Sequence, residues 1–340
     1  MIENKLKKQN QELTTKDYYY DSFSHHAIHE ELLKDSVRVT AFQNAILENR
    51  HLFEGKIVLD IGCGVGIYSL FAAYAGAQLV IGVDSSAIIT QTEEIIQKNG
   101  YSDLIKLIKS PIEELDHLPN GIEKVDIIIC EWMGYCLYYE NMLPNLIYAR
   151  DKWLKDDGIM FPNQIQLFIS AIEDERTSKH KVEFWKDVWG YDMSCMKELA
   201  DFELFVDFVA PDNLVTNDYL LKEINLETIL LEQVISRDKF VLKALKNDYV
   251  HSFIVFFSYS FTHGEKPIVV STSPYSPPTH WKQSILNIPD EIIICVDEEI
   301  EGFLKIKPSK TNKRNLEVII EYKFEGKRCS VKNKQNYKFY

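Results

Sequence analysis

Residues 57–66 read IVLDIGCGVG, an apolar run that carries a single aspartate and leads into a glycine-rich turn. The run is typical of a buried β-strand, and its glycines allow the chain to turn tightly into a helix. Three more apolar runs follow, at 79–84, 103–110 and 124–132. Helical patterns separate the first three of the four runs. Strands that alternate with helices predict an α/β domain with a doubly wound, Rossmann-like parallel sheet.

Composition places the whole chain among globular proteins. It has 340 residues, of which 46% are hydrophobic and 26% charged; this suffices for about two domains and excludes a disordered or collagenous protein. No apolar run reaches the ~18–20 residues of a membrane span, so we expect no membrane partner. The first residues lack the apolar stretch of a secretory signal, and the six scattered cysteines favour a reducing compartment.

The charge is unevenly distributed along the chain. The net charge is −13, but residues 301–340 alone carry 11 basic and 4 acidic side chains, which leaves −20 on the rest. The negative charge of residues 1–300 disfavours nucleic acid as the main partner, because binding phosphates requires clustered Lys and Arg side chains. It favours a cationic substrate, although charge that only maintains solubility would explain the same excess.

The pattern divides the chain into a polar, mobile start at 1–16, an α/β domain with N-terminal helices at 17–162, and an all-β domain at 163–340. The N-terminal helix is predicted to run from Tyr18 to about Asn49. In the last domain, β-branched and aromatic residues alternate as in antiparallel strands. One segment, about 180–199, is rich in aromatic residues and partly helical, like an arm that needs a surface to bury against.

The first candidate site is the turn after residues 57–61. The G-x-G-x-x-G fingerprint of dinucleotide-binding domains would need a glycine at position 67, where this chain has Ile67. A nicotinamide cofactor is therefore disfavoured. Asp60 would repel a phosphate and suits an ammonium group, whereas Asp84, at the end of the next strand, can bind both ribose hydroxyls. A ribose with a cationic amino-acid tail is S-adenosylmethionine. The alternative is that the glycines merely close a strand–helix turn.

The second candidate site is residues 131–140, EWMGYCLYYE, which follow the fourth apolar run. Ligands of open α/β sheets bind beyond the carboxyl ends of the strands. Glu131 and Glu140 could face one point and match the donors of a guanidinium, while the aromatic residues between them stack on the cation. The alternative is that both are ordinary carboxylates at the rim of the sheet.

Four segments together resemble the type I protein arginine methyltransferases, from about Asp17 to the C-terminus. They are DYYYDSFSHHAIHEELLKDSVR (17–38), VLDIGCGVGIYS (58–69), CEWMGYCLYYENML (130–143) and THWKQ (279–283). The resemblance implies an S-adenosylmethionine-binding domain followed by a β-barrel. It also implies a head-to-tail homodimer, in which the arm of one subunit packs on the cofactor domain of the other.

The resemblance also implies roles for single residues. The catalytic set is Glu131, Glu140, His280 and Asp35. The cofactor-binding set, which includes the already inferred Asp60, is His29, Arg38, Asp60, Gly62, Gly64, Asp84, Glu113 and Met142. Tyr19 and Trp281 are expected beside the substrate, and no metal is expected. The histidine–aspartate pair could act as a base or could brace the barrel against the N-terminal helices, and bracing is favoured.

The predicted activity is therefore S-adenosylmethionine-dependent mono- and asymmetric dimethylation of arginine, on Arg/Gly-rich proteins and histones, in the nucleus and cytoplasm. Three positions depart from the family pattern: Phe23 replaces a tyrosine, Leu32 a methionine and Asp84 a glutamate. The alternatives are an inactive scaffold of the same fold that binds basic proteins, and a methyltransferase that acts on small molecules.

Overall fold

The computed structural model describes residues 18–175, 181 and 183–340, which fall into two compact units. The described parts of unit 1 lie within Met1–Trp132, Pro144–Asn163 and Ser260–Ile268, and those of unit 2 within Met133–Leu143, Gln164–Tyr259 and Val269–Tyr340. The sequence places its boundary before residue 163 and does not foresee that segments 133–143 and 260–268 belong to the opposite units. The predicted mobile start at 1–16 lies outside the described residues.

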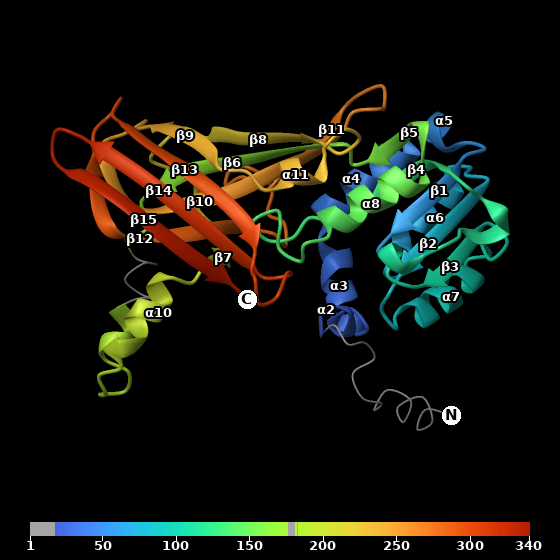
Figure 1. Ribbon diagram of the computed structural model, residues 1–340, viewed down its shortest axis with the longest axis horizontal. Coiled ribbons are helices and arrows are strands. Elements are labelled where there is room, and N and C mark those ends of the chain that lie inside the picture. Colours follow the sequence, from blue (N-terminus) through green and yellow to red (C-terminus); the bar gives the residue numbers. More distant parts are fainter. Residues whose placement is uncertain (1–17, 176–180, 182) are drawn as a thin grey trace. The chain divides into compact units, whose positions relative to one another are not determined.

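Unit 1 is built on a parallel sheet with the strand order β3-β2-β1-β4-β5 (Figure 1). Its strands are β1 (Ile57–Ile61), β2 (Leu79–Asp84), β3 (Ile105–Lys109), β4 (Val125–Cys130) and β5 (Leu154–Phe161). The first four agree with the predicted runs, but β5 was not predicted, because its LKDDG start reads as a turn. The strand order reverses between β1 and β4, and this is where open α/β sheets bind ligands.

The helices of unit 1 correct one prediction. They are α2 (Tyr18–Ser22), α3 (His26–Lys34), α4 (Ser36–Leu47), α5 (Arg50–Phe53), α6 (Ile67–Tyr74), α7 (Ile89–Lys98) and α8 (Leu143–Trp153). The single N-terminal helix is thus divided, because the Asp35 carboxylate accepts the Arg38 N–H at 3.0 Å and starts α4 as a new helix. Within the described residues, no helix is long and apolar enough to cross a membrane.

Unit 2 contains two sheets, with the strand orders β7-β12-β10-β6-β8 and β15-β14-β13-β9 (Figure 1). β8 contacts β9 on one side and β12 contacts β15 on the other, so the two sheets are joined on both sides and form the predicted barrel-like domain. Its elements are β6 (Gln164–Ile172), β7 (Phe205–Asp207), β8 (Tyr219–Asn225), α11 (Leu231–Val234), β9 (Asp238–Lys243), β10 (Asp248–Phe261), β11 (Ile268–Ser271), β12 (Gln283–Ile294), β13 (Glu299–Pro308), β14 (Leu316–Glu325) and β15 (Ser330–Phe339).

The barrel core follows from the predicted alternation. Along β14, buried and outer residues alternate through most of the strand, so Val318, Ile320 and Phe324 face inward. Side chains of one strand point alternately to the two faces of a sheet, and an alternating sequence therefore buries one face. The same alternation predicts an antiparallel domain in this half of the chain.

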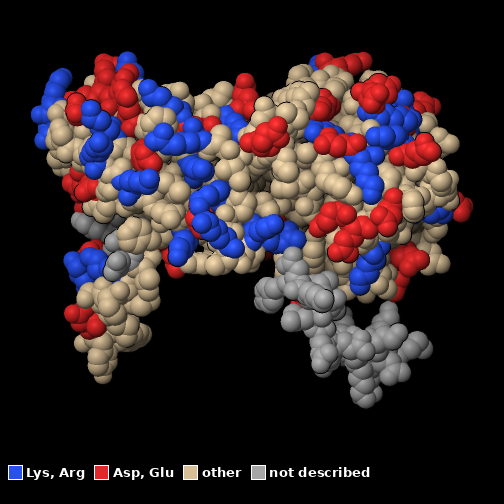
Figure 2. Space-filling model, viewed as in Figure 1, with Lys and Arg blue, Asp and Glu red and all other residues tan. Residues whose placement is uncertain are grey.

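The arm, about residues 180–199, leaves the barrel strands as short helical turns that end in α10 (Lys197–Asp201), and Figure 1 shows α10 projecting from unit 2. Residues 180 and 182 lie outside the described part. The exposed fractions of Trp189, Tyr191 and Leu199 are 95%, 71% and 58%. Figure 2 shows most of this projection as uncharged surface. Exposed apolar clusters of this kind are typical of surfaces that pack against another protein.

Candidate active site

The glycine turn after β1 requires glycine at three positions. Gly62, Gly64 and Gly66 have φ values of 70°, 51° and 81°, in the left-handed region that side chains disfavour. Their N–H groups all donate within the protein, to the Val83 carbonyl, the Asp84 carboxylate and the Cys63 carbonyl. These three N–H groups therefore already have acceptors within the protein. A ligand without a phosphate does not require them.

Asp84 is fixed at the end of β2. Its Oδ2 accepts the Gly64 N–H at 2.9 Å, and its Oδ1 accepts the Ser86 hydroxyl at 2.6 Å and the Ser86 N–H at 2.8 Å. On the other side of the turn, the His29 ring lies 3.2 Å from the place where a Cβ on Gly64 would be. His29 Nε2 donates to the Phe23 carbonyl at 2.8 Å, which fixes the ring. The structure thus brings three of the predicted cofactor residues together.

Asp60 lies beneath the turn and is only 1% exposed. Its carboxyl accepts the Ser69 hydroxyl at 2.6 Å. Burial raises the pKa of Asp60 to about 7, because the charged form loses its hydration. A buried carboxyl of this kind is stabilised in its charged form by a cationic partner, as the predicted ammonium contact requires.

We expect Asp60 to make stability depend on pH in the absence of ligand. A carboxyl whose pKa rises on folding stabilises the fold below about pH 3.9, and this contribution is lost as pH rises through the folded value of about 7. Asp60→Asn avoids that loss, so its free energy of unfolding should increase relative to wild type from about pH 5 to 7 and then level off. Urea unfolding of both proteins between about pH 5 and 7 tests this prediction. A difference in the free energy of unfolding that does not change with pH would contradict it.

Glu131 follows β4 and is held by an arginine. Arg38 Nη1 lies 2.6 Å from Glu131 Oε2, and the two side chains are 6% and 14% exposed. Arg38 Nη2 also donates to the Leu32 carbonyl at 2.8 Å. The structure therefore shows that Arg38 steadies Glu131, while the expected contact of Arg38 with the cofactor stays a prediction.

Because this ion pair is nearly buried, removing its arginine should be costly. Arg38→Ala leaves the Glu131 carboxylate without its cation in a largely desolvated place, and we expect the free energy of unfolding to fall by about 3–5 kcal/mol. Lys34→Ala is the matched control, because its ion pair with Glu30 is exposed to solvent and should contribute little to stability. Urea denaturation of both variants measures the difference, and equal losses would show that the Arg38 pair does not act as a buried one.

The remaining residues predicted to bind cofactor or substrate, or to act in catalysis, are divided between the two units. In unit 1, Glu113 accepts the Asn145 amide at 2.8 Å, and the Tyr19 ring centroid lies 4.8 Å from that of Phe23. Asp35, which starts α4, is also in unit 1, whereas His280 is in unit 2. Their pairing therefore stays a prediction.

In unit 2, the segment 133–143 has an unusual backbone. Four non-glycine residues of the segment have positive φ: Cys136, Leu137, Glu140 and Asn141. A Cβ on Gly134 would lie 2.2 Å from the Tyr139 carbonyl oxygen, so the segment folds back closely on itself. Such conformations persist only where the surroundings enforce them, and they concentrate at functional sites.

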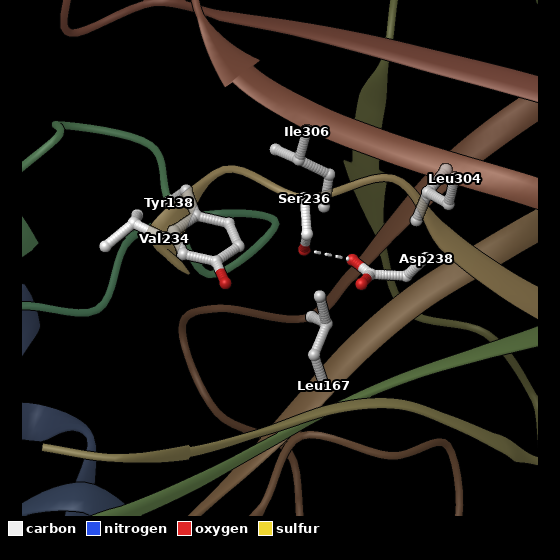
Figure 3. A pocket seen from close by; sticks show the side chains of 7 residues that line it. All are labelled: Tyr138, Leu167, Val234, Ser236, Asp238, Leu304 and Ile306. Carbon is white, nitrogen blue, oxygen red and sulfur yellow. Dashed lines mark hydrogen bonds between the residues drawn. The ribbon is translucent and has the colours of Figure 1, made fainter. Parts of the chain in front are cut away.

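Trp281 and Tyr138 anchor this segment to the barrel. Trp281 Nε1 donates to the Met133 carbonyl at 2.8 Å, and the indole is 2% exposed. Trp281 thus supports the segment from within unit 2, and its contact with substrate stays a prediction. The Tyr138 ring lines a small barrel pocket with Asp238, which accepts the Ser236 hydroxyl at 2.8 Å (Figure 3).

Sequence reasoning missed the residues that fix the far end of the segment. The Phe339 ring packs on Tyr139 with centroids 4.7 Å apart, and burial together with the Glu140 charge raises the pKa of Tyr139. Arg314 Nη1 donates to the Glu140 carbonyl at 2.8 Å and lies 3.6 Å from the Met142 sulfur. Nothing local in the sequence marks Arg314 or Phe339, because their partners are distant along the chain.

The residues of unit 1 fit S-adenosylmethionine. Within the described part of the chain, no atom beyond Gly62 and its two sequence neighbours lies within 4 Å of the place of a Cβ on Gly62, so the turn offers open space. Beside this turn, the Asp84 carboxylate is fixed, and Asp60 supplies a buried acid for an ammonium group. Among the described residues, no cluster of three or more His, Cys, Asp or Glu side chains is arranged to hold a metal ion.

Two family models match the chain. The arginine methyltransferase oligomerization subdomain matches residues 163–327, and a methyltransferase domain matches residues 52–206. The protein arginine N-methyltransferase 1 of Chlamydomonas reinhardtii is 47% identical over 96% of this chain and 93% of that protein. The enzyme of the same name from Dictyostelium discoideum is 46% identical over 94% and 93%.

Solved structures agree. A Trypanosoma brucei PRMT1 enzyme–prozyme heterotetrameric complex with AdoHcy matches with a TM-score of 0.89 and 38% identity, over 94% of this chain and 100% of that chain. Arabidopsis thaliana protein arginine methyltransferase 10 matches with a TM-score of 0.85 and 25% identity, over 94% and 99%. With its methyltransferase domain, its oligomerization subdomain and these nearly full-length relatives, the chain belongs to the S-adenosylmethionine-dependent protein arginine N-methyltransferases.

Proposed function

We propose that this enzyme forms monomethylarginine and asymmetric dimethylarginine, with Glu131 and Glu140 together binding the substrate guanidinium. The observation that carries the proposal is the Arg38–Glu131 ion pair of 2.6 Å, which fixes one carboxylate at the end of β4. The second carboxylate, Glu140, is the last residue of the segment 131–140. Its main chain is held by Arg314 of the barrel.

The mechanism follows from charge. Bound S-adenosylmethionine supplies an electrophilic methyl group on a cationic sulfur. A protonated guanidinium is a poor nucleophile, because its lone pairs are delocalised. Two carboxylates that accept its N–H groups fix its orientation and draw positive charge to the nitrogens they bind. The remaining nitrogen is then directed at the methyl group, so orientation and preorganised charge lower the barrier.

The asymmetric product is supported by the place of Leu32. Its carbonyl accepts the Arg38 Nη2 group at 2.8 Å, so it lies beside the ion pair. The family pattern has a methionine at this position that helps to set which dimethyl product forms, and leucine fills nearly the same volume, although it is stiffer. The proposed substrates are Arg/Gly-rich proteins and histones, which the negative charge of residues 1–300 would attract.

We also propose that the enzyme is a homodimer in the nucleus and cytoplasm. The exposed aromatic residues of the arm support the dimer, since they need a partner surface. The free state of all six cysteines is compatible with a reducing compartment.

Transfer of labelled methyl groups tests the proposed function. We expect label from S-adenosylmethionine to enter an Arg/Gly-rich peptide and not the matched peptide in which lysine replaces each arginine. Calorimetry on the same protein measures whether it binds S-adenosylhomocysteine, and so whether the cofactor site is intact. Binding without transfer to the arginine peptide would indicate an inactive scaffold and would contradict the proposal.

A further inference from the structure

The strongest feature without an assigned role is the attachment of Glu140 to a single arginine of the barrel. Glu140 and the next residue, Asn141, have φ values of 77° and 54°, so both lie in the left-handed region. A free segment of non-glycine residues would relax from this backbone, because extended or right-handed conformations are more favourable. The main chain at Glu140 must therefore be held in this conformation by its surroundings.

Arg314 holds that main chain on both sides of Glu140. The Glu140 N–H donates to the Arg314 carbonyl at 3.0 Å, and Arg314 Nη1 donates to the Glu140 carbonyl at 2.8 Å. The same Nη1 lies 3.6 Å from the sulfur of Met142, two residues further on. One residue thus ties both peptide groups that flank the Glu140 Cα, and this fixes the start of its side chain.

Arg314 is itself held in place. It lies in the connection between β13 and β14, which the Ser309 N–H closes by donating to the Asn315 carbonyl at 2.8 Å. Within this turn, the Asn312 side chain accepts the Arg314 N–H at 3.0 Å. Arg314 is half-buried, whereas its neighbour Lys313 is exposed. A fixed, planar donor reaching one carbonyl is the kind of preorganised support that keeps a functional group in a single geometry.

We propose that Arg314 is a positioning residue for methyl transfer, which holds the main chain at Glu140 so that this carboxylate meets the substrate guanidinium. The proposal rests on the proposed role of Glu140. Arg314 makes no contact with substrate in this account and acts only through the backbone it fixes. Its loss should therefore affect turnover of the arginine substrate and leave cofactor binding in unit 1 unchanged.

The first test compares Arg314→Ala, Arg314→Lys and the control Lys313→Ala, which removes the same charge one residue earlier. We expect Arg314→Ala to lower kcat/KM for an Arg/Gly-rich peptide by more than about tenfold, mainly through kcat. Arg314→Lys should recover part of this loss, because lysine keeps one donor but lacks the planar fork. The affinity for S-adenosylhomocysteine should stay within about twofold of wild type in all three variants.

A double-mutant cycle with Glu140→Gln separates positioning from general support. If Arg314 acts through Glu140, Arg314→Ala should cause little further loss of kcat in the Glu140→Gln enzyme. If the double variant instead loses kcat by the product of the two single losses, the proposal is overturned. An Arg314→Ala enzyme that is as active as Lys313→Ala would also overturn it. If Arg314→Ala fails to fold, Arg314→Lys takes its place in the cycle. Full activity of Glu140→Gln alone would instead refute the proposed function of Glu140.

Discussion

Glu131→Gln and Glu140→Gln are each expected to lower the rate of arginine methylation by more than about tenfold, a barrier increase above ~1.4 kcal/mol. Glutamine keeps the size of the side chain but loses the charge that binds the guanidinium and the second acceptor of a bidentate pair. The affinity for S-adenosylhomocysteine should remain nearly unchanged, because the two carboxylates address the substrate. Initial rates at saturating cofactor, together with calorimetry, measure both quantities.

The two variants should differ in stability, and this provides an internal check. Glu131→Gln removes the charged partner of Arg38, which is 6% exposed, and should lower the free energy of unfolding as well as the rate. Glu123→Gln, an exposed position in the same unit, serves as the control with unchanged rate and stability. Either active-site variant keeping more than about a tenth of wild-type activity would refute the proposed clamp.

Deleting the arm is expected to produce monomers with weakened cofactor binding. Replacing residues 180–199 by a short Gly/Ser linker removes apolar side chains such as Trp189, which is 95% exposed in the single chain. Since such surface requires a partner, its loss should abolish the dimer. Weaker cofactor binding is expected because the arm of one subunit is proposed to pack on the cofactor domain of the other.

Sedimentation and calorimetry check this prediction. Trp189→Ala tests the same surface with a single change, and Tyr275→Ala is the control, since Tyr275 is a 62% exposed aromatic residue of unit 2 outside the arm. We expect the deletion to sediment as a monomer, Trp189→Ala to dissociate at higher concentrations than wild type, and Tyr275→Ala to behave as wild type. A deletion variant that still sediments as a dimer would rule out the arm as the dimer contact.

Much of the fold could be predicted because its signals are local. The apolar runs that became β1 to β4 are continuous, as expected for strands of a parallel sheet covered on both faces. The alternation in β14 likewise determines which face is buried. The N-terminal helix was predicted as one element because helical periodicity does not reveal that a carboxylate, here Asp35, starts a new helix within it.

The candidate site was predictable where a motif is contiguous and not where distant segments meet. Asp60 and Asp84 lie near the carboxyl ends of adjacent strands, so a parallel sheet places them at one edge. Arg314, by contrast, is separated from Glu140 by 174 residues, and no local pattern marks their contact. The acceptors of the glycine-turn N–H groups are not marked in the sequence either, because two of them, Val83 and Asp84, lie in β2 and the third is Cys63 within the turn itself.

The most direct measurement is the identity of the methylated product. An Arg/Gly-rich peptide is incubated with this enzyme and S-adenosylmethionine, and fragmentation mass spectrometry separates monomethylarginine from the two dimethylarginine isomers. The proposed clamp and the place of Leu32 beside it predict monomethylarginine first and asymmetric dimethylarginine at completion. Symmetric dimethylarginine as the main product, or an unmodified peptide, would contradict this account.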